Sequence, residues 1–322
     1  MRLDRVGLWW VPLLLFVAPM LGMIPAHRDL IDFFLPMRAA TADMLASGTA
    51  PWLNLANGCG EAWFANPETA VLYPPGWLHL FLAAAWAMTA EIAFHLVWLA
   101  LGVGLLEGRL GASRQGRTVA EVAAWSAGPV LVTVGVLNNL EALAWLPWMV
   151  IASRVEGRKS IPLLAGTTAM AWLGGEPQVW AMAVVLTFLY ARQRRVTATG
   201  LILGAVLVTP QLVPFLYWVA EGDRGGPAAA AWALRGAVTP ADWAGVLAPV
   251  AVASDGRMVY AESLFLGAPI VVCALLGLWR NKWMLVAVAG LGLLATLPEI
   301  GGDSLFLGLT GGLVRYPSRF AL

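Results

Sequence analysis

A succession of long apolar runs is the feature of this sequence that most constrains its fold. Hydrophobic residues make up 60% of the 322 positions and charged residues only 12%, whereas soluble domains carry about 25% charged residues. An apolar helix of about 20 residues is long enough to cross the hydrocarbon core of a membrane. The sequence therefore predicts an all-α polytopic membrane protein with about nine transmembrane helices. The predicted spans cover residues 7–25, 88–106, 118–137, 139–153, 161–174, 177–191, 197–216, 261–279 and 283–298.

The distribution of basic residues predicts how these spans are oriented. Most Lys and Arg residues fall in short segments that share one side if the N-terminus is cytoplasmic, as the positive-inside rule requires. We therefore expect a multi-pass protein of a bacterial-type plasma (inner) membrane, with its chemistry on the extracytoplasmic side. The run at 7–25 is expected to remain as a first span, because no small-residue cleavage site precedes a soluble domain. The apolar segment 76–87 is too short to cross and is expected to lie at the interface.

The spans and loops predict one transmembrane domain over residues 1–322. Its main outer segments would be a first loop at 26–76, a second large loop at 217–260 and a C-terminal segment at 299–322. The last of these resembles the approach to another helix, so we expect the chain to be a fragment of a longer protein. Shorter outer turns are expected to converge on the first loop, at residues 138–141, 174–178 and 209–214.

Two carboxylates open the first loop and are the first candidates for catalysis. Asp29 and Asp32 are three residues apart, a spacing that places both on one face of a helix. One interpretation is a pair of solvated charges at a helix end. The other is a general base or metal ligand, with the neighbouring Arg28 tuning Asp29 or holding a phosphate.

The short outer turns carry further polar side chains that have both structural and functional interpretations. Asn139 and Glu141 suit the capped start of a helix, and Glu176 and Gln178 flank a proline that suits a first helical turn. In the functional interpretation the same side chains contact a sugar or acceptor. Gln211 lies between Pro210 and Pro214 in a predicted broken helix end, which is tolerated where it lines a cavity.

Two arginines near the end of the chain have the same two interpretations. Arg315 and Arg319 are either anchors at the membrane interface or contacts to a phosphate group. Cys59 and Cys273 form no disulfide framework or metal pattern. No nucleotide-binding, zinc-protease or serine-hydrolase motif is present in the sequence.

Several short motifs together resemble a known family. They are Asp29, Phe34-Leu35-Pro36-Met37-Arg38, Pro51-Trp52-Leu53-Asn54, Ala65-Asn66-Pro67, Leu72-Tyr73-Pro74-Pro75, Leu143-Ala144-Trp145-Leu146-Pro147-Trp148, Gly174-Gly175-Glu176-Pro177-Gln178, Pro210-Gln211-Leu212-Val213-Pro214 and Arg315-Tyr316-Pro317-Ser318-Arg319-Phe320. In this order they resemble the YfhO-like bacterial membrane proteins. That family belongs to the GT-C class of glycosyltransferases.

The resemblance implies an inverting glycosyltransferase of the cell envelope. It would transfer a sugar from a polyprenyl-phosphate-linked donor to an extracytoplasmic hydroxyl of a glycan, lipid, wall polymer or protein. The catalytic residues would be Asp29 and Asp32. Substrate-binding roles would fall on Arg28, Arg38, Asn54, Asn66, Tyr73, Asn139, Glu141, Glu176, Gln178, Gln211, Arg315 and Arg319. A divalent cation, Mg²⁺ or Mn²⁺, is compatible with this chemistry, although no protein metal ligands are assigned.

Two other functions remain open from the sequence. One is a transporter or flippase of a lipid-linked or small anionic substrate, which predicts titratable residues in the middle of spans. Glu91 and His95 are the only such candidates, and the simpler interpretation is a packed pair near the outer end of a helix. The other is a non-catalytic envelope assembly protein, in which replacing Asp29 by Asn has no effect.

Overall fold

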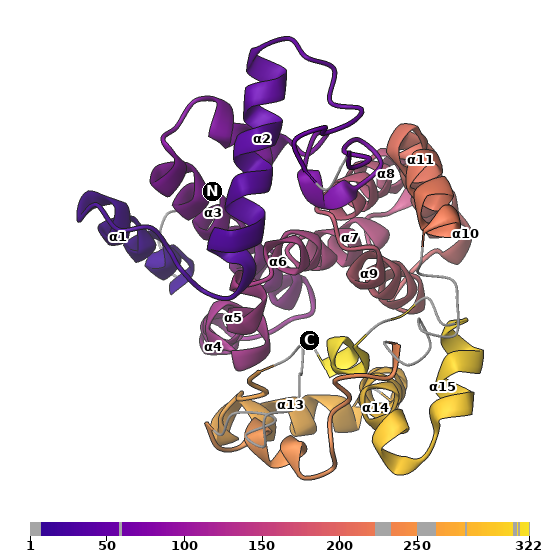
Figure 1. The fold of residues 1–322 in the computed structure, drawn as a ribbon. Helices are drawn as coiled ribbons and strands as arrows, with labels where there is room; N and C mark the ends of the chain where they lie inside the picture. Colours follow the sequence, from indigo (N-terminus) through magenta and orange to yellow (C-terminus); the bar gives the residue numbers. More distant parts are fainter. Residues whose placement is uncertain are drawn as a thin grey trace. The chain divides into compact units, whose positions relative to one another are not determined.

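The computed structural model describes residues 8–57, 60–222, 233–249, 262–280, 282–311, 314 and 316–321. About 73% of the chain is helical and the described residues form no β-strand. The nearest approach to a sheet is one antiparallel bridge between Asn54 and Glu61. Figure 1 shows the fold coloured from the N-terminus to the C-terminus.

The helical elements are mostly short. They are η1 (Leu8–Phe16), α1 (Val17–Met20), η2 (Leu30–Phe34, a π-helix), α2 (Leu35–Ala46), η3 (Pro67–Thr69), η4 (Pro74–Leu80), α3 (Ala84–Arg109), α4 (Arg114–Ser126), α5 (Gly128–Val134), α6 (Leu137–Leu143), α7 (Leu146–Ser153), η5 (Gly157–Lys159), α8 (Ser160–Leu173), α9 (Pro177–Leu189), α10 (Arg194–Leu207), α11 (Thr209–Glu221), η7 (Asp242–Val246), α13 (Ala268–Arg280), α14 (Lys282–Thr296), η8 (Leu297–Ile300), α15 (Asp303–Thr310) and η9 (Pro317–Ala321).

Only one of these helices is long and apolar enough to cross a membrane. That helix is α3, and 56% of its most apolar stretch is buried within the fold. A buried core helix of this length meets the same criterion. The pair α10 and α11 would add a second span if counted together, but the two helices are bent by 72° at the break between them. The prediction of about nine transmembrane helices is therefore wrong, and so is the predicted multi-pass localisation in a plasma membrane.

The predicted spans fail because apolar composition does not fix the length of an uninterrupted helix. The run at 118–137 is divided between α4 and α5, and the run at 139–153 between α6 and α7. Helix α9 has 13 residues, which is about 20 Å at 1.5 Å per residue. The hydrocarbon core is about 30 Å thick, so a helix of this length ends well short of the far side.

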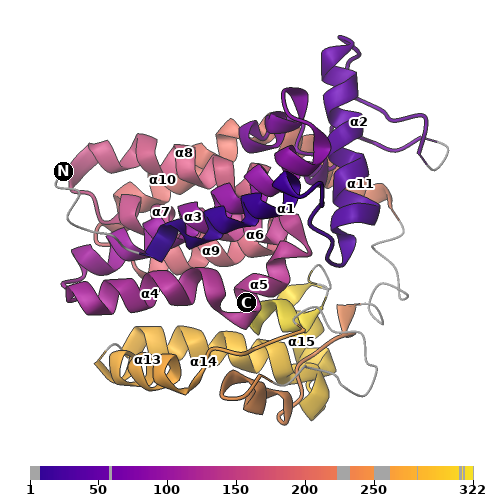
Figure 2. The same ribbon diagram turned by 90° about the vertical axis from the view of Figure 1, so that its left-hand side faces the viewer.

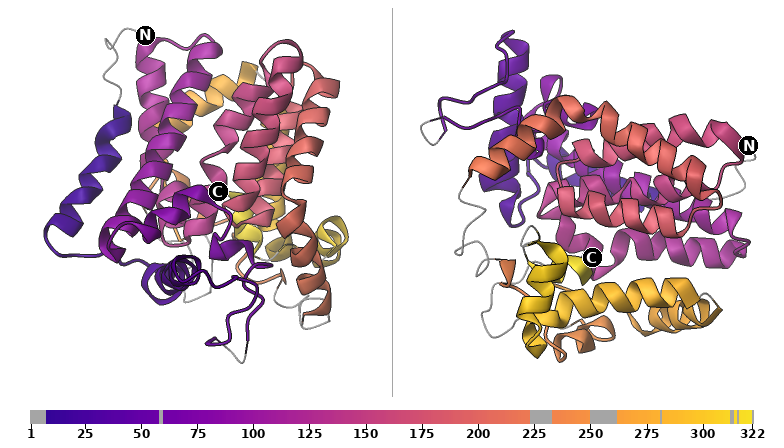
Figure 3. Two further views of the ribbon diagram at one scale, coloured as in Figure 1. Left: turned by 90° about the horizontal axis from the view of Figure 1, so that it is seen from above. Right: turned by 90° about the vertical axis from the view of Figure 1, so that its right-hand side faces the viewer.

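The chain divides into two compact units, where the sequence predicts one domain. The first comprises residues 1–125 and 133–218, and the second residues 126–132 and 219–322. In the first unit, α2 runs across the direction of α3, α8 and α10 (Figures 2 and 3). Elements η1 and α1 lie along α3. This unit contains both predicted catalytic residues.

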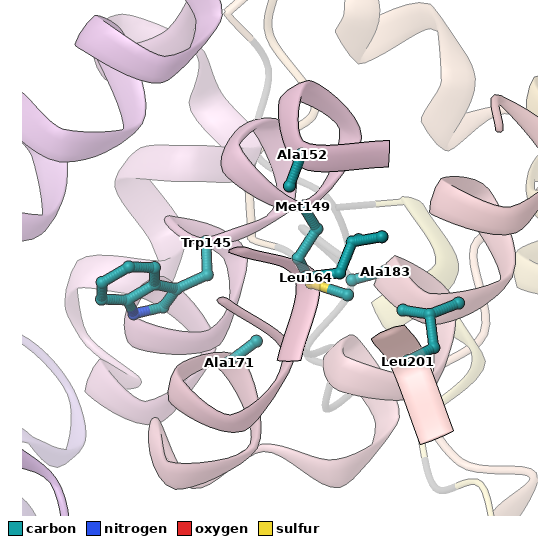
Figure 4. Close-up of a cluster of buried hydrophobic side chains, with 7 residues drawn as sticks. All are labelled: Trp145, Met149, Ala152, Leu164, Ala171, Ala183 and Leu201. Carbon is teal, nitrogen blue, oxygen red and sulfur yellow. The ribbon is translucent and has the colours of Figure 1, made fainter. Parts of the chain in front are cut away.

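The centre of the first unit is a hydrophobic cluster drawn from α7 to α10. Its buried members are Trp145, Met149, Ala152, Leu164, Ala171, Ala183 and Leu201 (Figure 4). Three of the seven are alanines, and small side chains let helix backbones approach closely. Gly200 and Gly204 of α10 extend this effect, since a Cβ atom at Gly204 would lie 2.5 Å from the Thr168 Cβ of α8. Helix α8 also packs against α6 and η3.

The second unit has its own small core. Val238, Leu264 and Ala295 are buried together. The Val238 N–H donates to the Ala295 carbonyl at 2.9 Å, and the Trp243 Nε1–H donates to Thr296 Oγ1 at 2.8 Å. The backbone of Ser318 in η9 also bonds to Gly236 within this unit.

Candidate functional site

A buried cluster of charged side chains forms where α2, η4, α3 and α6 meet in the first unit. At its centre is Arg38, which lies on the buried face of α2 together with Met37 and Thr41. The Arg38 Nε–H is shared between the two carboxylate oxygens of Glu91, at 3.1 and 3.3 Å. Its Nη2 donates to both oxygens of Glu141, at 2.9 and 3.0 Å. One guanidinium therefore binds two carboxyl groups from two other helices.

Two further contacts complete this charged cluster. Arg38 Nη1 donates to the backbone carbonyl of Glu68 at 2.7 Å, so all of the nitrogens of the guanidinium have partners. His79 of η4 lies with its Nε2 3.2 Å from the second oxygen of Glu91. Gly76 leaves room for these contacts, because a Cβ atom there would lie 2.9 Å from that of Ala70. We refer to Arg38, His79, Glu91 and Glu141 as the Arg38 cluster.

Burial dominates the electrostatics of the Arg38 cluster. Side-chain exposure is 1% for Arg38, 0% for Glu91 and 1% for Glu141. Burial works against the charged guanidinium, but the two carboxyl groups outweigh it and raise the pKa of Arg38 above its ordinary value. Burial, aided by the charge of Glu91, raises the pKa of Glu141 well above its usual range despite the neighbouring Arg38. The cluster thus holds a permanent cation and at least one carboxyl group that favours its neutral form.

A second set of buried hydrogen bonds runs beside the cluster. Trp145 Nε1 donates to the Tyr73 hydroxyl at 3.0 Å, and that hydroxyl lies 2.5 Å from His95 Nε2. The other ring nitrogen of His95 lies 2.6 Å from the Glu91 carbonyl. Because a carbonyl only accepts, His95 carries its proton on Nδ1 and accepts from Tyr73 at Nε2. Burial raises the pKa of Tyr73 well above its ordinary value, so it remains a phenol.

A third group of polar side chains joins the first loop to the turn before α9. Asn138 donates from Nδ2 to Glu68 Oε1 at 2.9 Å and to Glu176 Oε2 at 3.2 Å. Asn139 Nδ2 donates to Asn138 Oδ1 at 3.0 Å. Gly175, with φ +92°, permits this approach, because its Cβ position is 3.0 Å from the Pro67 carbonyl oxygen. The structure thus brings the first loop and the turns at 138–141 and 174–178 together.

The sequence suggests that each of these two turns starts a helix, and the structure agrees for only one of them. Glu176 caps α9, accepting from the Gln178 N–H at 3.3 Å, and Pro177 is the first helical residue. The segment 138–141, in contrast, lies inside α6 rather than in a turn. Val136 precedes α6 and makes no side-chain cap. Asn139 and Glu141 therefore face the interior of the unit.

Asp29 and Asp32 lie apart from these buried groups. Both are exposed, at the start of and within η2. The Asp29 N–H donates to the Gly135 carbonyl at 3.2 Å, and a Cβ atom at Gly135 would lie 2.5 Å from His27. Arg28 has φ +46°, in the left-handed region that non-glycine residues seldom occupy. The two carboxylates are thus presented to solvent from a segment that is fixed at its backbone.

The remaining predicted site residues either form hydrogen bonds with the protein backbone or lie outside the first unit's described residues. Asn54 accepts from the Ala56 N–H, Asn66 caps η3 by accepting from Glu68, and Gln211 donates to the Phe64 carbonyl. Arg319 lies in the second unit, with its guanidinium 5.6 Å from the centre of the Tyr316 ring. Arg315 lies outside the described residues.

The sequence predicts no functional role for four residues of the site, namely Glu68, His79, Glu91 and His95. It favours the interpretation of Glu91 and His95 as a packed pair, and it assigns no role to Glu68 or His79. The available signal was a carboxylate within an apolar helix, since Glu is almost never fully buried unless it is paired. Its partner, Arg38, lies 53 positions away, and no local pattern connects the two.

No group of three or more potential metal ligands occurs among the described residues. Comparison with protein-family models, curated proteins and solved structures finds no match to this chain.

Proposed function

We propose that this protein is a glycosyltransferase that takes a sugar from a polyprenyl-phosphate-linked donor and uses Asp29 as its general base. In this reaction Asp29 accepts the proton of an acceptor hydroxyl. The hydroxyl oxygen attacks the anomeric carbon, the bond from that carbon to the phosphate oxygen breaks, and polyprenyl phosphate leaves. Attack opposite the leaving group inverts the anomeric configuration.

The observation that carries this proposal is the availability of Asp29. Two of the other predicted acidic site residues, Glu141 and Glu176, are buried and bonded to neighbouring side chains. Asp29 is exposed, and its carboxylate makes no hydrogen bond or ion pair with the described residues. A general base must come within about 3 Å of the proton that it removes, which requires a carboxylate that substrate can reach.

The backbone around Asp29 suits a positioning role. Arg28 has a left-handed backbone conformation, and the Asp29 N–H donates to the Gly135 carbonyl. Unusual backbone conformations of this kind occur often at functional sites. Asp32 is one helical turn further on and shares the exposed surface, where it would orient Asp29 or bind a cation.

Charge stabilisation of the departing phosphate is assigned to Arg28. The developing charge needs a nearby cation. Arg38 is committed to Glu91 and Glu141 inside the fold, so it supports the site rather than contacting phosphate. Arg28 immediately precedes Asp29 and is only half-buried.

The test is release of polyprenyl phosphate from labelled polyprenyl-phosphate sugars, with membrane extract as the acceptor. We expect donor-specific release that falls about 10²- to 10⁴-fold in Asp29→Asn. The matched control is Asp43→Asn, which changes another exposed carboxylate, on α2, and is expected to leave the rate unchanged.

The alternatives give different results in the same assay. Release that persists in Asp29→Asn but disappears in Asp32→Asn would support the same reaction with Asp32 as the general base. Absence of release and of binding with every donor, in a folded wild-type protein, would contradict the transferase and favour an assembly role.

A further inference from the structure

The Arg38 cluster contains more potential negative charge than its permanent cation can neutralise. Arg38 carries one positive charge, while Glu91 and Glu141 carry two negative charges if both are ionised. All three side chains are at most 1% exposed, so water cannot compensate the difference. An uncompensated buried charge is strongly unfavourable, and the pair therefore requires one additional proton.

We infer that the Arg38 cluster is a proton-binding site, in which one proton resides on Glu141. Arg38 then pairs with a single net negative charge, and the cluster is neutral as a whole. Both carboxyl groups accept hydrogen bonds from the same guanidinium.

The geometry identifies Glu141 rather than Glu91 as the protonated partner. Glu91 receives donors from two residues, Arg38 Nε at 3.1 Å and His79 Nε2 at 3.2 Å. Among the described residues, Glu141 receives only the Nη2 of Arg38, at 2.9 and 3.0 Å. Hydrogen bonds to a carboxylate favour its charged form. Glu91 is therefore the ionised member, and Glu141 retains its proton.

His79 is the alternative place for the proton. A protonated His79 with two ionised carboxylates would also give a neutral cluster. The other titratable groups that approach are Tyr73 and His95, which are occupied by their own hydrogen bonds. The cluster therefore has two neutral forms that differ in the location of one proton. Within the described part of the chain, Glu91 has donors from two residues and Glu141 from one, which favours the form with the proton on Glu141.

The proton has a structural consequence because the four side chains come from four elements. Arg38 belongs to α2, His79 to η4, Glu91 to α3 and Glu141 to α6. Loss of the proton would leave one buried negative charge without a partner at their junction. The site thus couples the packing of α2, and of the preceding segment with Asp29, to the protonation of Glu141.

Infrared spectroscopy of the whole chain tests this inference directly. Exposed carboxyl groups are ionised at neutral pH, so a C=O stretching band of a protonated carboxyl group reports a buried one. We expect this band in the wild type near neutral pH and its loss in Glu141→Gln. It should persist in His79→Gln. The control is Glu121→Gln, because Glu121 on α4 is a half-buried carboxyl group outside the cluster and its band must be subtracted.

Each outcome decides the assignment. A band that remains after subtraction of the Glu121 contribution and disappears in Glu141→Gln supports the proton site. Absence of such a band in the wild type overturns it, because both carboxylates are then ionised and His79 holds the proton. The wild-type and His79→Gln spectra decide the question even if Glu141→Gln does not fold. Glycosyl transfer plays no part in this measurement, so a failure of the proposed function leaves the inference intact.

Discussion

Arg38 and Glu141 are 103 positions apart in the sequence and form a buried ion pair, with Arg38 Nη2 2.9 Å from Glu141 Oε1. Glu91 completes the arrangement from a third helix. A guanidinium suits this position because it is always charged and offers several N–H donors in a planar fork. The pair links α2 to α6 inside the first unit.

Replacing Arg38 by Met is expected to reduce the free energy of unfolding by about 3–5 kcal/mol, because it leaves buried carboxyl groups without their cation. The measurement is denaturant-induced unfolding followed by tryptophan fluorescence. Arg158→Met is the control, since Arg158 is exposed and surface substitutions usually change stability by less than about 0.5 kcal/mol. Equal effects for the two variants would show that the buried pair contributes nothing.

Glu141→Gln is expected to change how stability depends on pH. The pKa of Glu141 is raised in the folded state relative to its ordinary value of 4.5. Its contribution is therefore fully present below pH 4.5 and is lost as the pH rises through the folded-state pKa. The difference in unfolding free energy, wild type minus Glu141→Gln, should fall as the pH increases. A difference that rises with pH would contradict the raised pKa.

Tyr73→Phe is expected to cost about 1–3 kcal/mol of unfolding free energy. The substitution removes the hydroxyl between Trp145 and His95, and unsatisfied buried polar groups carry a penalty of that size. Thermal and denaturant unfolding measure the loss. Tyr217→Phe serves as the comparison, because the Tyr217 side chain is 68% exposed. Loss of its hydroxyl should leave the unfolding free energy unchanged.

Gly204→Ala is expected to destabilise the first unit by about 1–3 kcal/mol through overpacking. The added Cβ atom would lie 2.5 Å from Thr168 Cβ and 3.0 Å from the Ala165 carbonyl oxygen. Gly166→Ala in α8 is the matched control, since nothing lies within 4 Å of its Cβ position. Alanine there should stabilise the helix by about 0.5–1 kcal/mol. The same sign for both variants would show that α8 and α10 are not tightly packed.

Local features of the site could be predicted from the sequence. The turn at 174–178 ends one helix and begins the next, with Glu176 as the cap and Pro177 as the first residue. These features depend on residues that are adjacent in the chain, so a short pattern contains the necessary information. The same type of reasoning failed at 138–141, where the residues suited to a helix cap lie within α6.

The number of membrane spans could not be predicted in the same way. Hydropathy identifies apolar segments, but packing and local breaks decide where each helix ends. The break between α6 and α7 and the 72° bend between α10 and α11 divide runs that appear continuous in composition.

The sequence by itself determined that this protein is helical, where several helices begin and which residues carry charge. Only the tertiary structure decided that Arg38, Glu91 and Glu141 are buried together while Asp29 and Asp32 stay exposed. Helix formation depends on interactions between neighbouring residues, which the sequence displays directly. A charged side chain can be buried only where partners from distant segments satisfy it, and those partners become neighbours only when the chain folds.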